Sequence, residues 1–148
     1  MKKIIRTVLA SVLLAGLASC DLETSDNGRL DGFWLLTTVD TLSTGGVSDV
    51  REEGLTWSFQ GRLLELREAT LSPRFVNILC RFEYTKTQLS VSSPVYVDRD
   101  HNDPDVESVE DLQRFGVNSL EETFDVVSLT HSKMVLRSDG LQLNFRKY

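Results

Sequence analysis

Apolar and polar residues alternate at every second position over much of the chain beyond residue 30. The alternation covers residues 55–60, 76–84, 88–92, 133–137 and 141–146. Successive side chains of a strand point to opposite faces of a sheet, so a period of two indicates strands with one buried and one solvent-facing side. Residues 33–39 are apolar on both faces and could be covered on both. The pattern predicts about eight short strands and an all-β domain.

Turn-forming residues separate these runs. Gly61 interrupts the alternation between Leu55 and Glu68, where we expect it to kink or bulge one continuous segment. Ser72-Pro73 ends another run. Ser138-Asp139-Gly140 predicts the clearest hairpin, because an Asp-Gly pair readily adopts positive φ angles. Short connections of this kind join sequential antiparallel strands.

One segment follows a different period. Its apolar residues recur at every third position, as Val106, Val109, Leu112 and Phe115. This spacing predicts an amphipathic helix over Asp103–Phe115, with Asp103 as its N-cap and Gly116 as its stop. The helix falls between the fifth and the sixth expected strands, and we expect its apolar stripe to pack over one end of the sheet.

The first twenty residues have a layout of their own. Lys2, Lys3 and Arg6 precede an apolar run that ends in Leu17-Ala18-Ser19-Cys20. Basic, apolar and small residues in that order indicate a secretory signal peptide. The Leu-Ala-Ser-Cys ending resembles the lipobox of bacterial lipoproteins, in which the chain is cut before the cysteine and the thiol receives a diacylglycerol. The resemblance implies that residues 1–19 are removed and that acylated Cys20 anchors the protein to a membrane.

Two other interpretations of this leader stay open. An ordinary secretory signal would leave Cys20 as a structural thiol. A transmembrane helix needs about 20 apolar residues, and this run is shorter. The rest of the chain has no second run of that kind, so we expect residues 20–30 to be a short polar tether and residues 31–148 to be one domain outside the bilayer.

The charge of the chain bears on its binding partners, and its cysteine content bears on disulfide bonds. The whole chain has a formal charge of −6, and the leader contributes only the three positive charges of Lys2, Lys3 and Arg6, which leaves −9 for the remainder. An acidic domain is a poor partner for nucleic acid and for an anionic membrane face. Once Cys20 is acylated, Cys80 has no partner for an internal disulfide. Its place in an alternating apolar run predicts a buried, unreactive thiol.

The residues after the expected anchor bear on localisation. Asp21 and Glu23 follow Cys20 directly. An acid at this place resembles two opposite sorting signals of Gram-negative lipoproteins, one for retention at the inner membrane and one for export to the cell surface. We favour a lipid-anchored protein of the cell envelope that lies at the outer membrane, and the cell surface is one of the places open to it there. The sequence leaves the leaflet and the oligomeric state open.

The start of the first strand carries a family resemblance. Asp31-Gly32-Phe33-Trp34 opens the strands directly after the tether, and residues 124–147 form two hairpins that resemble the small lipocalin-like lipoproteins of bacteria. A Gly-x-Trp at this place resembles the lipocalin (calycin) families. The resemblance implies an eight-stranded antiparallel up-and-down β-barrel, with Trp34 under its closed end and Arg146 covering Trp34. The helix between strands five and six departs from the lipocalin pattern, in which the helix follows the barrel.

The same resemblance implies binding of a small apolar or amphipathic ligand inside the barrel. Trp57, Phe82 and Tyr84 are the expected wall residues. The same side chains could instead fill the barrel, because a barrel of eight strands is only just wide enough to hold its own side chains. The alternative function is therefore an interaction module with a filled barrel that docks an envelope protein or glycan. His101 and His131 stand in polar connections without a nucleophile beside them, so we expect no enzyme.

One acidic loop is a candidate for a cation. Asp98, Asp100 and Asn102 place oxygen atoms at alternate positions, as at the start of a calcium-binding loop. Asp103 stands where such a loop needs glycine, and Val109 stands where it needs glutamate. A solvated loop that begins the helix is the simpler interpretation. We therefore expect neither a metal nor another cofactor, with calcium as the weaker alternative.

Overall fold

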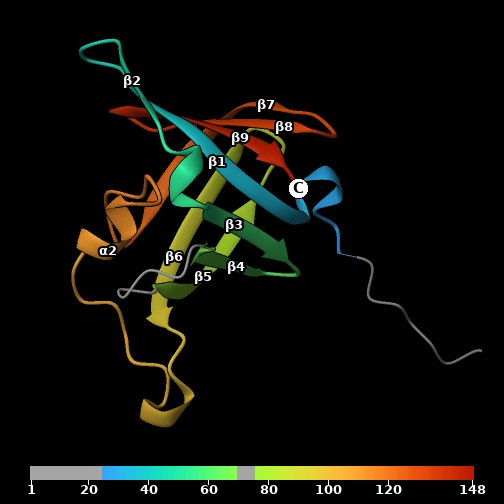
Figure 1. The fold of residues 1–148 in the computed structure, drawn as a ribbon. Helices are drawn as coiled ribbons and strands as arrows, with labels where there is room; N and C mark the ends of the chain where they lie inside the picture. The colour runs from blue at the N-terminus through green and yellow to red at the C-terminus, as the bar shows by residue number, and fades with distance from the viewer. Residues whose placement is uncertain (1–24, 70–75) are drawn as a thin grey trace, which may run out of the picture.

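The strands of the described chain form one closed antiparallel sheet (Figure 1). The computed structural model describes residues 25–69 and 76–148, so the leader, Cys20 and the expected turn at Ser72-Pro73 lie outside it. The strand order is β2-β1-β3-β4-β5-β6-β7-β8-β9, and β1 also pairs with β9. The strands are β1 (Gly32–Thr41), β2 (Gly46–Asp49), β3 (Leu55–Gln60), β4 (Leu63–Glu68), β5 (Asn77–Tyr84), β6 (Gln88–Tyr96), β7 (Glu122–Leu129), β8 (Lys133–Arg137) and β9 (Leu141–Lys147).

The barrel itself is made by β1 and β3–β9, which confirms the predicted eight-stranded antiparallel barrel. The first part of β1 pairs with β3, through Gly32↔Phe59 to Leu35↔Thr56. Its last part pairs instead with β2, through Thr38↔Asp49 to Thr41↔Gly46. The short strand β2 therefore extends the sheet beyond the barrel wall, and all four of its residues are exposed.

Two predicted turns have different outcomes. Gly61 does not bulge a continuous strand: with Arg62 it forms the tight turn between β3 and β4, and its φ is +61°. The ladder continues directly on both sides of that turn, from Gln60↔Leu63 to Leu55↔Glu68. The turn at Ser138-Asp139-Gly140 is confirmed, since Ser138 N donates to Leu141 O at 2.9 Å.

The expected long helix is wrong in extent and right in position. α2 covers only Glu110–Gln113, after the fifth barrel strand (β6) and before the sixth (β7). Asn102 and Asp103 have φ values of +62° and +46°, which a right-handed helix cannot accommodate. The chain then pairs with the end of β6, because Tyr96 N donates to Pro104 O and Val95 bridges to Asp105. Asp103 is therefore not an N-cap.

Three 3₁₀ turns complete the described chain: η1 (Gly28–Leu30), η2 (Arg51–Glu53) and η3 (Arg99–His101). None of the helices in the described ranges is long or apolar enough to cross a bilayer. The expected tether ends earlier than residue 30, because Leu30 is buried and Asn27 Nδ2 donates to Gly61 O at 2.8 Å. Residues 27–30 thus pack on the barrel.

The strand register defines two ends of the barrel. The closed end carries η1, the last residues of β9, and the turns at 61–62, 85–87 and 130–132. The open end carries the long connections 42–54 and 97–121 and the turn at 138–140. One apolar core runs between the two ends and includes Cys80, which is buried and free, as expected.

Candidate functional site

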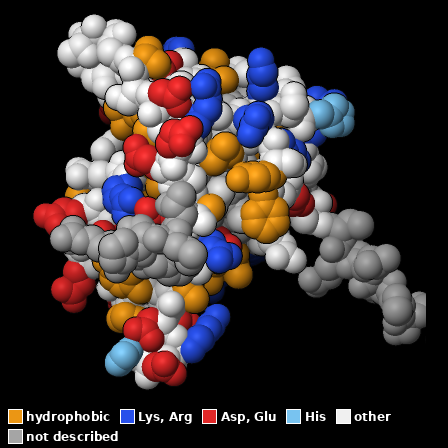
Figure 2. All heavy atoms as spheres, in the orientation of Figure 1, with side chains coloured by type: hydrophobic (Ala, Val, Ile, Leu, Met, Phe, Trp, Pro, Cys, Tyr) orange, Lys and Arg blue, Asp and Glu red, His pale blue; other side chains and the backbone are white. Residues whose placement is uncertain are grey.

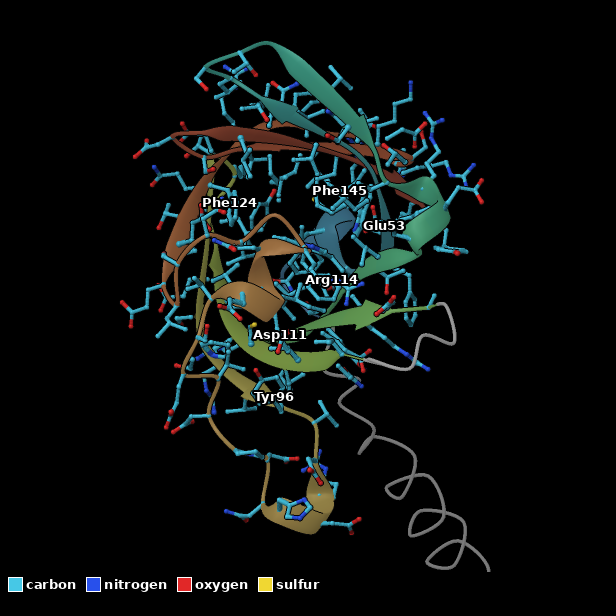
Figure 3. The ribbon with its side chains drawn as sticks, turned by 60° about the vertical axis from the view of Figure 1, so that its left-hand side comes forward. Glu53, Tyr96, Asp111, Arg114, Phe124 and Phe145 are labelled. Carbon is cyan, nitrogen blue, oxygen red and sulfur yellow. The ribbon has the colours of Figure 1, made fainter. Side chains whose placement is uncertain are left out.

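The mouth of the barrel at the open end is filled by residues 106–117, which we call the capping segment. Its apolar side chains Val106, Leu112, Phe115 and Val117 are all buried in the core. The three-residue period placed Val106, Leu112 and Phe115 on one face together with Val109, which is only half-buried, whereas Val117 lies beyond the predicted stripe; most of the segment is not helical. In Figure 3 the segment lies in front of the ring of strands, with Phe145 above it and Tyr96 below.

Trp57 of β3 lies directly under the capping segment. Its Nε1 donates to the backbone oxygen of Phe115 at 3.2 Å. Its ring makes edge contacts with Phe124, at a centroid distance of 5.7 Å, and with Phe145, at 5.2 Å. The hydrogen bond satisfies a buried indole N–H, which would otherwise be a substantial penalty. Trp57 therefore joins the capping segment to the aromatic centre of the barrel.

Two polar side-chain contacts hold the rim of the capping segment. Arg114 Nη2 lies 3.1 Å from Glu68 Oε1, and the Glu68 side chain is only 5% exposed. Tyr96 Oη donates to Asp111 Oδ2 at 2.8 Å. The hydrogen bond to Asp111, with burial and the negative charges of Asp111 and Glu110, raises the pKa of Tyr96. The phenol therefore keeps its proton, and the contact persists, to a higher pH than for a free tyrosine.

Gly116 allows the chain to turn back into the mouth. Its φ is +83°, and a Cβ built on it would lie 2.5 Å from Cδ2 of Leu143. Both the backbone angle and the space thus require glycine. Gly116 was predicted as a helix stop; the structure shows it as the point of closest approach between the capping segment and β9.

The three expected wall residues do not line one cavity. Trp57 is fully buried below the capping segment, whereas Phe82 is buried nearer the closed end and Tyr84 is half-buried beside the β5–β6 turn. Phe59 lies between the first two, with its ring centroid 6.1 Å from that of Trp57 and 5.1 Å from that of Phe82. In the described part of the chain these rings fill the barrel.

Two hollows lie on the surface of the described residues. One lies beside the Tyr96–Asp111 contact and includes Asn77, whose Oδ1 is buried without a hydrogen-bond partner. The other lies between residues 118–125 and 137–140. Sequence reasoning did not identify Glu68, Tyr96, Asp111 or Arg114. Only the apolar spacing of residues 106–115 pointed to this region, because pairs as distant in sequence as Glu68 and Arg114 leave no local signal.

The expected pair of Trp34 and Arg146 at the closed end is half right: Trp34 is in place, but a different residue covers it. Trp34 is fully buried, and its Nε1 donates to Leu30 O at 2.8 Å. The cation over its ring is Lys147, whose Nζ lies 4.9 Å from the ring centroid and donates to Arg29 O at 2.9 Å. Arg146 stands opposite Leu35 and is exposed. The reason is strand alternation: Lys147, one residue further, shares the face of its partner Trp34.

In the acidic loop, the carboxylates of Asp98 and Asp103 contact other groups of the same loop. Asp98 Oδ2 contacts His101 Nδ1 at 2.7 Å, and Asp103 accepts from Arg99 at 2.6 Å and from Asp98 N at 2.9 Å. Asp100 and Asn102 are exposed on η3 and just after it. Within the described ranges, no three His, Cys, Asp or Glu side chains come together as a metal site would require. His131 is exposed in the β7–β8 turn.

Comparison with known proteins identifies the family. A family model described as a lipocalin-like domain matches residues 13–148. The structure is similar to that of a lipocalin-like protein from Bacteroides uniformis, with 21% identity, a TM-score of 0.61, and coverage of 82% of this chain and 100% of that chain. It is also similar to an uncharacterized protein from Bacteroides eggerthii, with 22% identity, a TM-score of 0.55, and coverage of 80% and 98%.

No curated protein matches this chain. At these identities the two solved structures support the fold, whereas the family model extends over almost the whole sequence. The closed eight-stranded barrel and this match agree. The chain belongs to the lipocalin-like domain family.

Proposed function

We propose that this protein is a membrane-anchored lipocalin-like protein that binds a small apolar or amphipathic ligand at the open end of its barrel. A lipocalin-like barrel is a scaffold for binding. The observation that carries the proposal is the capping segment, whose buried side chains Leu112 and Phe115 occupy the mouth where a ligand of a hollow barrel would sit. The ligand would take their place, and the segment would act as a lid.

The contacts of the lid are few enough for displacement. Its side-chain contacts are Trp57–Phe115, Glu68–Arg114 and Tyr96–Asp111; its first residue, Val106, also donates from its backbone N to Pro94 O at 3.0 Å, and its apolar side chains are buried. Each such contact contributes about 1 kcal/mol net. Releasing all three would reduce the apparent affinity roughly 100-fold relative to an open barrel. A ligand that buries new apolar area on Trp57, Phe124 and Phe145 gains about 25 cal/mol per Å² against that cost.

The second part of the proposal is the anchor. Cys20 carries the acyl chains, and the domain is held at the envelope, with the outer membrane favoured. Two or more acyl chains hold a protein firmly, since each buried methylene contributes about 0.8 kcal/mol. No catalytic activity, cofactor or nucleic-acid partner belongs to this proposal, and Trp57 is the predicted wall residue that the ligand would contact.

Uptake of a fluorescent fatty acid by the processed protein tests ligand binding. Arg114→Ala removes one rim contact of the nearly buried Glu68 carboxylate, so we expect affinity to rise at least threefold while the free energy of unfolding falls by about 1–3 kcal/mol. Arg99→Ala is the matched control, because Arg99 lies on η3 and pairs with Asp103, and both residues lie outside the capping segment. Fluorescence titration gives the affinities. No saturable uptake by either variant would contradict the proposal.

A second candidate function is an interaction module with a filled barrel. The observation in its favour is the packed aromatic centre, where Trp57 contacts Phe59, Phe124 and Phe145. In that case the outer surface would dock an envelope protein or glycan, and Arg114→Ala would change stability without any fatty-acid uptake. Recovery of one dominant envelope partner with the wild-type protein would then support docking.

A further inference from the structure

The two ends of the barrel differ in their balance of basic and acidic side chains. The closed end carries the basic residues Arg29, Arg62, Lys86, Lys133, Arg146 and Lys147. The open-end connections carry the exposed acids Glu52, Asp100, Asp105, Glu107, Glu110 and Glu121. Asp26 and Glu83 are exposed acids near the closed end, and Arg51, Arg67, Arg99 and Arg137 are exposed basic residues near the open end, where the acids still outnumber them. A domain that is acidic as a whole thus has one end suited to an anionic surface.

Two of these cations face each other without an anion between them. Lys133 of β8 stands directly opposite Arg146 of β9, and both are exposed. Among the described residues neither takes part in an ion pair. Like charges directly opposite on neighbouring strands are destabilising. An external anion next to the pair would remove that repulsion.

Two aromatic side chains extend the same outer face toward the closed end. Phe33 is 58% exposed and Tyr148 is 77% exposed. Tyr148 N donates to Phe33 O at 3.0 Å, so the two residues lie across from each other on β1 and after β9. In Figure 2, hydrophobic side chains near the end of β9 lie beside a group of Lys and Arg side chains, whereas the lower end around η3 carries acids together with a basic side chain and a histidine. Exposed aromatics beside cations are typical of membrane interfaces.

The length of chain before the barrel limits where this face can be. Residues 27–30 are packed on the closed end, through Asn27 and the buried Leu30. Only four residues lie between Cys20 and Ser25, so five Cα–Cα steps join them. A fully extended chain of that length spans about 18 Å at most. An acylated Cys20 would therefore keep the closed end close to the headgroups.

We propose that the outer face formed by Phe33, Tyr148, Lys133 and Arg146, which we call the docking face, lies against anionic phospholipid headgroups of the bilayer that holds the anchor. The inference rests on the proposed anchor for the identity of that bilayer. The tether and the docking face hold the closed end on the membrane, and the acidic open end with its capping segment faces away. The mouth is thereby presented to the aqueous side.

Sedimentation with lipid vesicles tests the docking face without the anchor. The chain 20–148 with Cys20→Ser contains every described strand and carries no acyl group. We expect it to bind vesicles of phosphatidylglycerol and phosphatidylcholine at low salt, to bind phosphatidylcholine alone poorly, and to lose binding as salt rises. The double variant Lys133→Glu, Arg146→Glu should bind at least tenfold more weakly.

The matched control is Arg51→Glu, Arg99→Glu, which makes the same change of charge at the open end. We expect it to bind as the parent chain does, and unfolding midpoints of both double variants verify that they are folded. Equal losses in the two double variants, or no binding by the parent chain, would overturn the docking face. An unacylated Cys20 in cells would instead refute the anchor, and the vesicle result would stand independently of it.

Discussion

The thiol of Cys80 illustrates how burial controls a single side chain. Cys80 lies opposite Leu64 in the barrel wall and is buried in the core. Burial raises the pKa of this thiol to about 12. The thiolate is the reactive form, so Cys80 is inert in the folded protein at neutral pH.

This pKa shift predicts a pH dependence of stability. In the unfolded chain the thiol has its ordinary pKa of 9.0, whereas in the folded barrel its pKa is about 12 and it stays protonated up to that pH. Its contribution to the free energy of unfolding is unchanged below pH 9 and then falls by about 1.4 kcal/mol per pH unit toward pH 12. Urea unfolding from pH 8 to pH 11 should show this slope in wild type and not in Cys80→Val. Identical slopes would contradict the argument.

The exchange of Arg146 for Lys147 at Trp34 is another effect of one position. A cation over the indole was expected, and one is there, 4.9 Å from the ring centroid. Neighbouring strand residues face opposite sides of the wall, so an error of one residue replaces an inward side chain with an outward one. The residue type could be anticipated, but its position depended on the β1–β9 register.

Strand β1 contributes to the apolar core at its start and to a set of polar contacts on the outer face at its end. A bulge shifts its pairing with β9 from Leu36↔Phe145 to Thr38↔Asn144. Beyond the bulge, Asn144 Nδ2 donates to Thr38 Oγ1 at 2.9 Å and to Asp40 Oδ2 at 3.0 Å on the outer face. The bulge thus lets one strand contribute core residues at its start and a polar ladder at its end.

The capping segment yields a prediction at Gly116. Gly116→Ala introduces a Cβ at 2.5 Å from Leu143 and forces an L-residue to a φ of +83°. We expect the free energy of unfolding to fall by about 2–4 kcal/mol, from overpacking and backbone strain together. Urea denaturation measures it.

Gly45→Ala separates the two causes. Gly45 has a φ of +69°, and a Cβ there would have no heavy atom within 4 Å. The free energy of unfolding of Gly45→Ala should fall by about 1 kcal/mol, from backbone strain alone. Equal losses for the two variants would mean that the contact between Gly116 and Leu143 contributes nothing.

The molecule as a whole combines a closed barrel with a strong separation of charge. The β1–β9 pairing removes both edges of the eight-stranded sheet, which leaves only β2 as an added edge strand. The acidic connections lie at the open end, and the polar chain that leads to Cys20 leaves from the basic closed end. The fold therefore places Ser25, the first described residue, and the capped mouth at opposite ends of the barrel.

Acylation of Cys20 is the prediction that concerns the protein as a unit. Cells that produce the full chain and take up labelled palmitate should incorporate the label into this protein and place it in the membrane fraction. Cys20→Ser should abolish both, while Cys80→Ala should change neither, because Cys80 is buried. Label in the Cys20→Ser protein, or none in wild type, would rule out this anchor.

The sequence by itself determined the class of fold, because it depends on local properties. Alternation of apolar and polar residues predicted the strands, Asp139-Gly140 predicted a hairpin, and Gly32-Phe33-Trp34 pointed to the lipocalin family. Burial of Cys80 and of Val106, Leu112 and Phe115 also followed from their spacing. These features need only the strand period and the preference of apolar side chains for the core.

The tertiary structure alone decided what depends on register and on distant contacts. Pairing with the end of β6 overrode the helical period of residues 103–109, and Gly61 closed a hairpin where a bulge was expected. The contacts of Arg114 with Glu68 and of Tyr96 with Asp111 join connections that come together only when the barrel closes. The alternation of apolar and polar residues fits a packed core and a ligand cavity equally well. Only the tertiary structure shows that the rings of Phe59 and Phe145 pack against that of Trp57 inside the barrel.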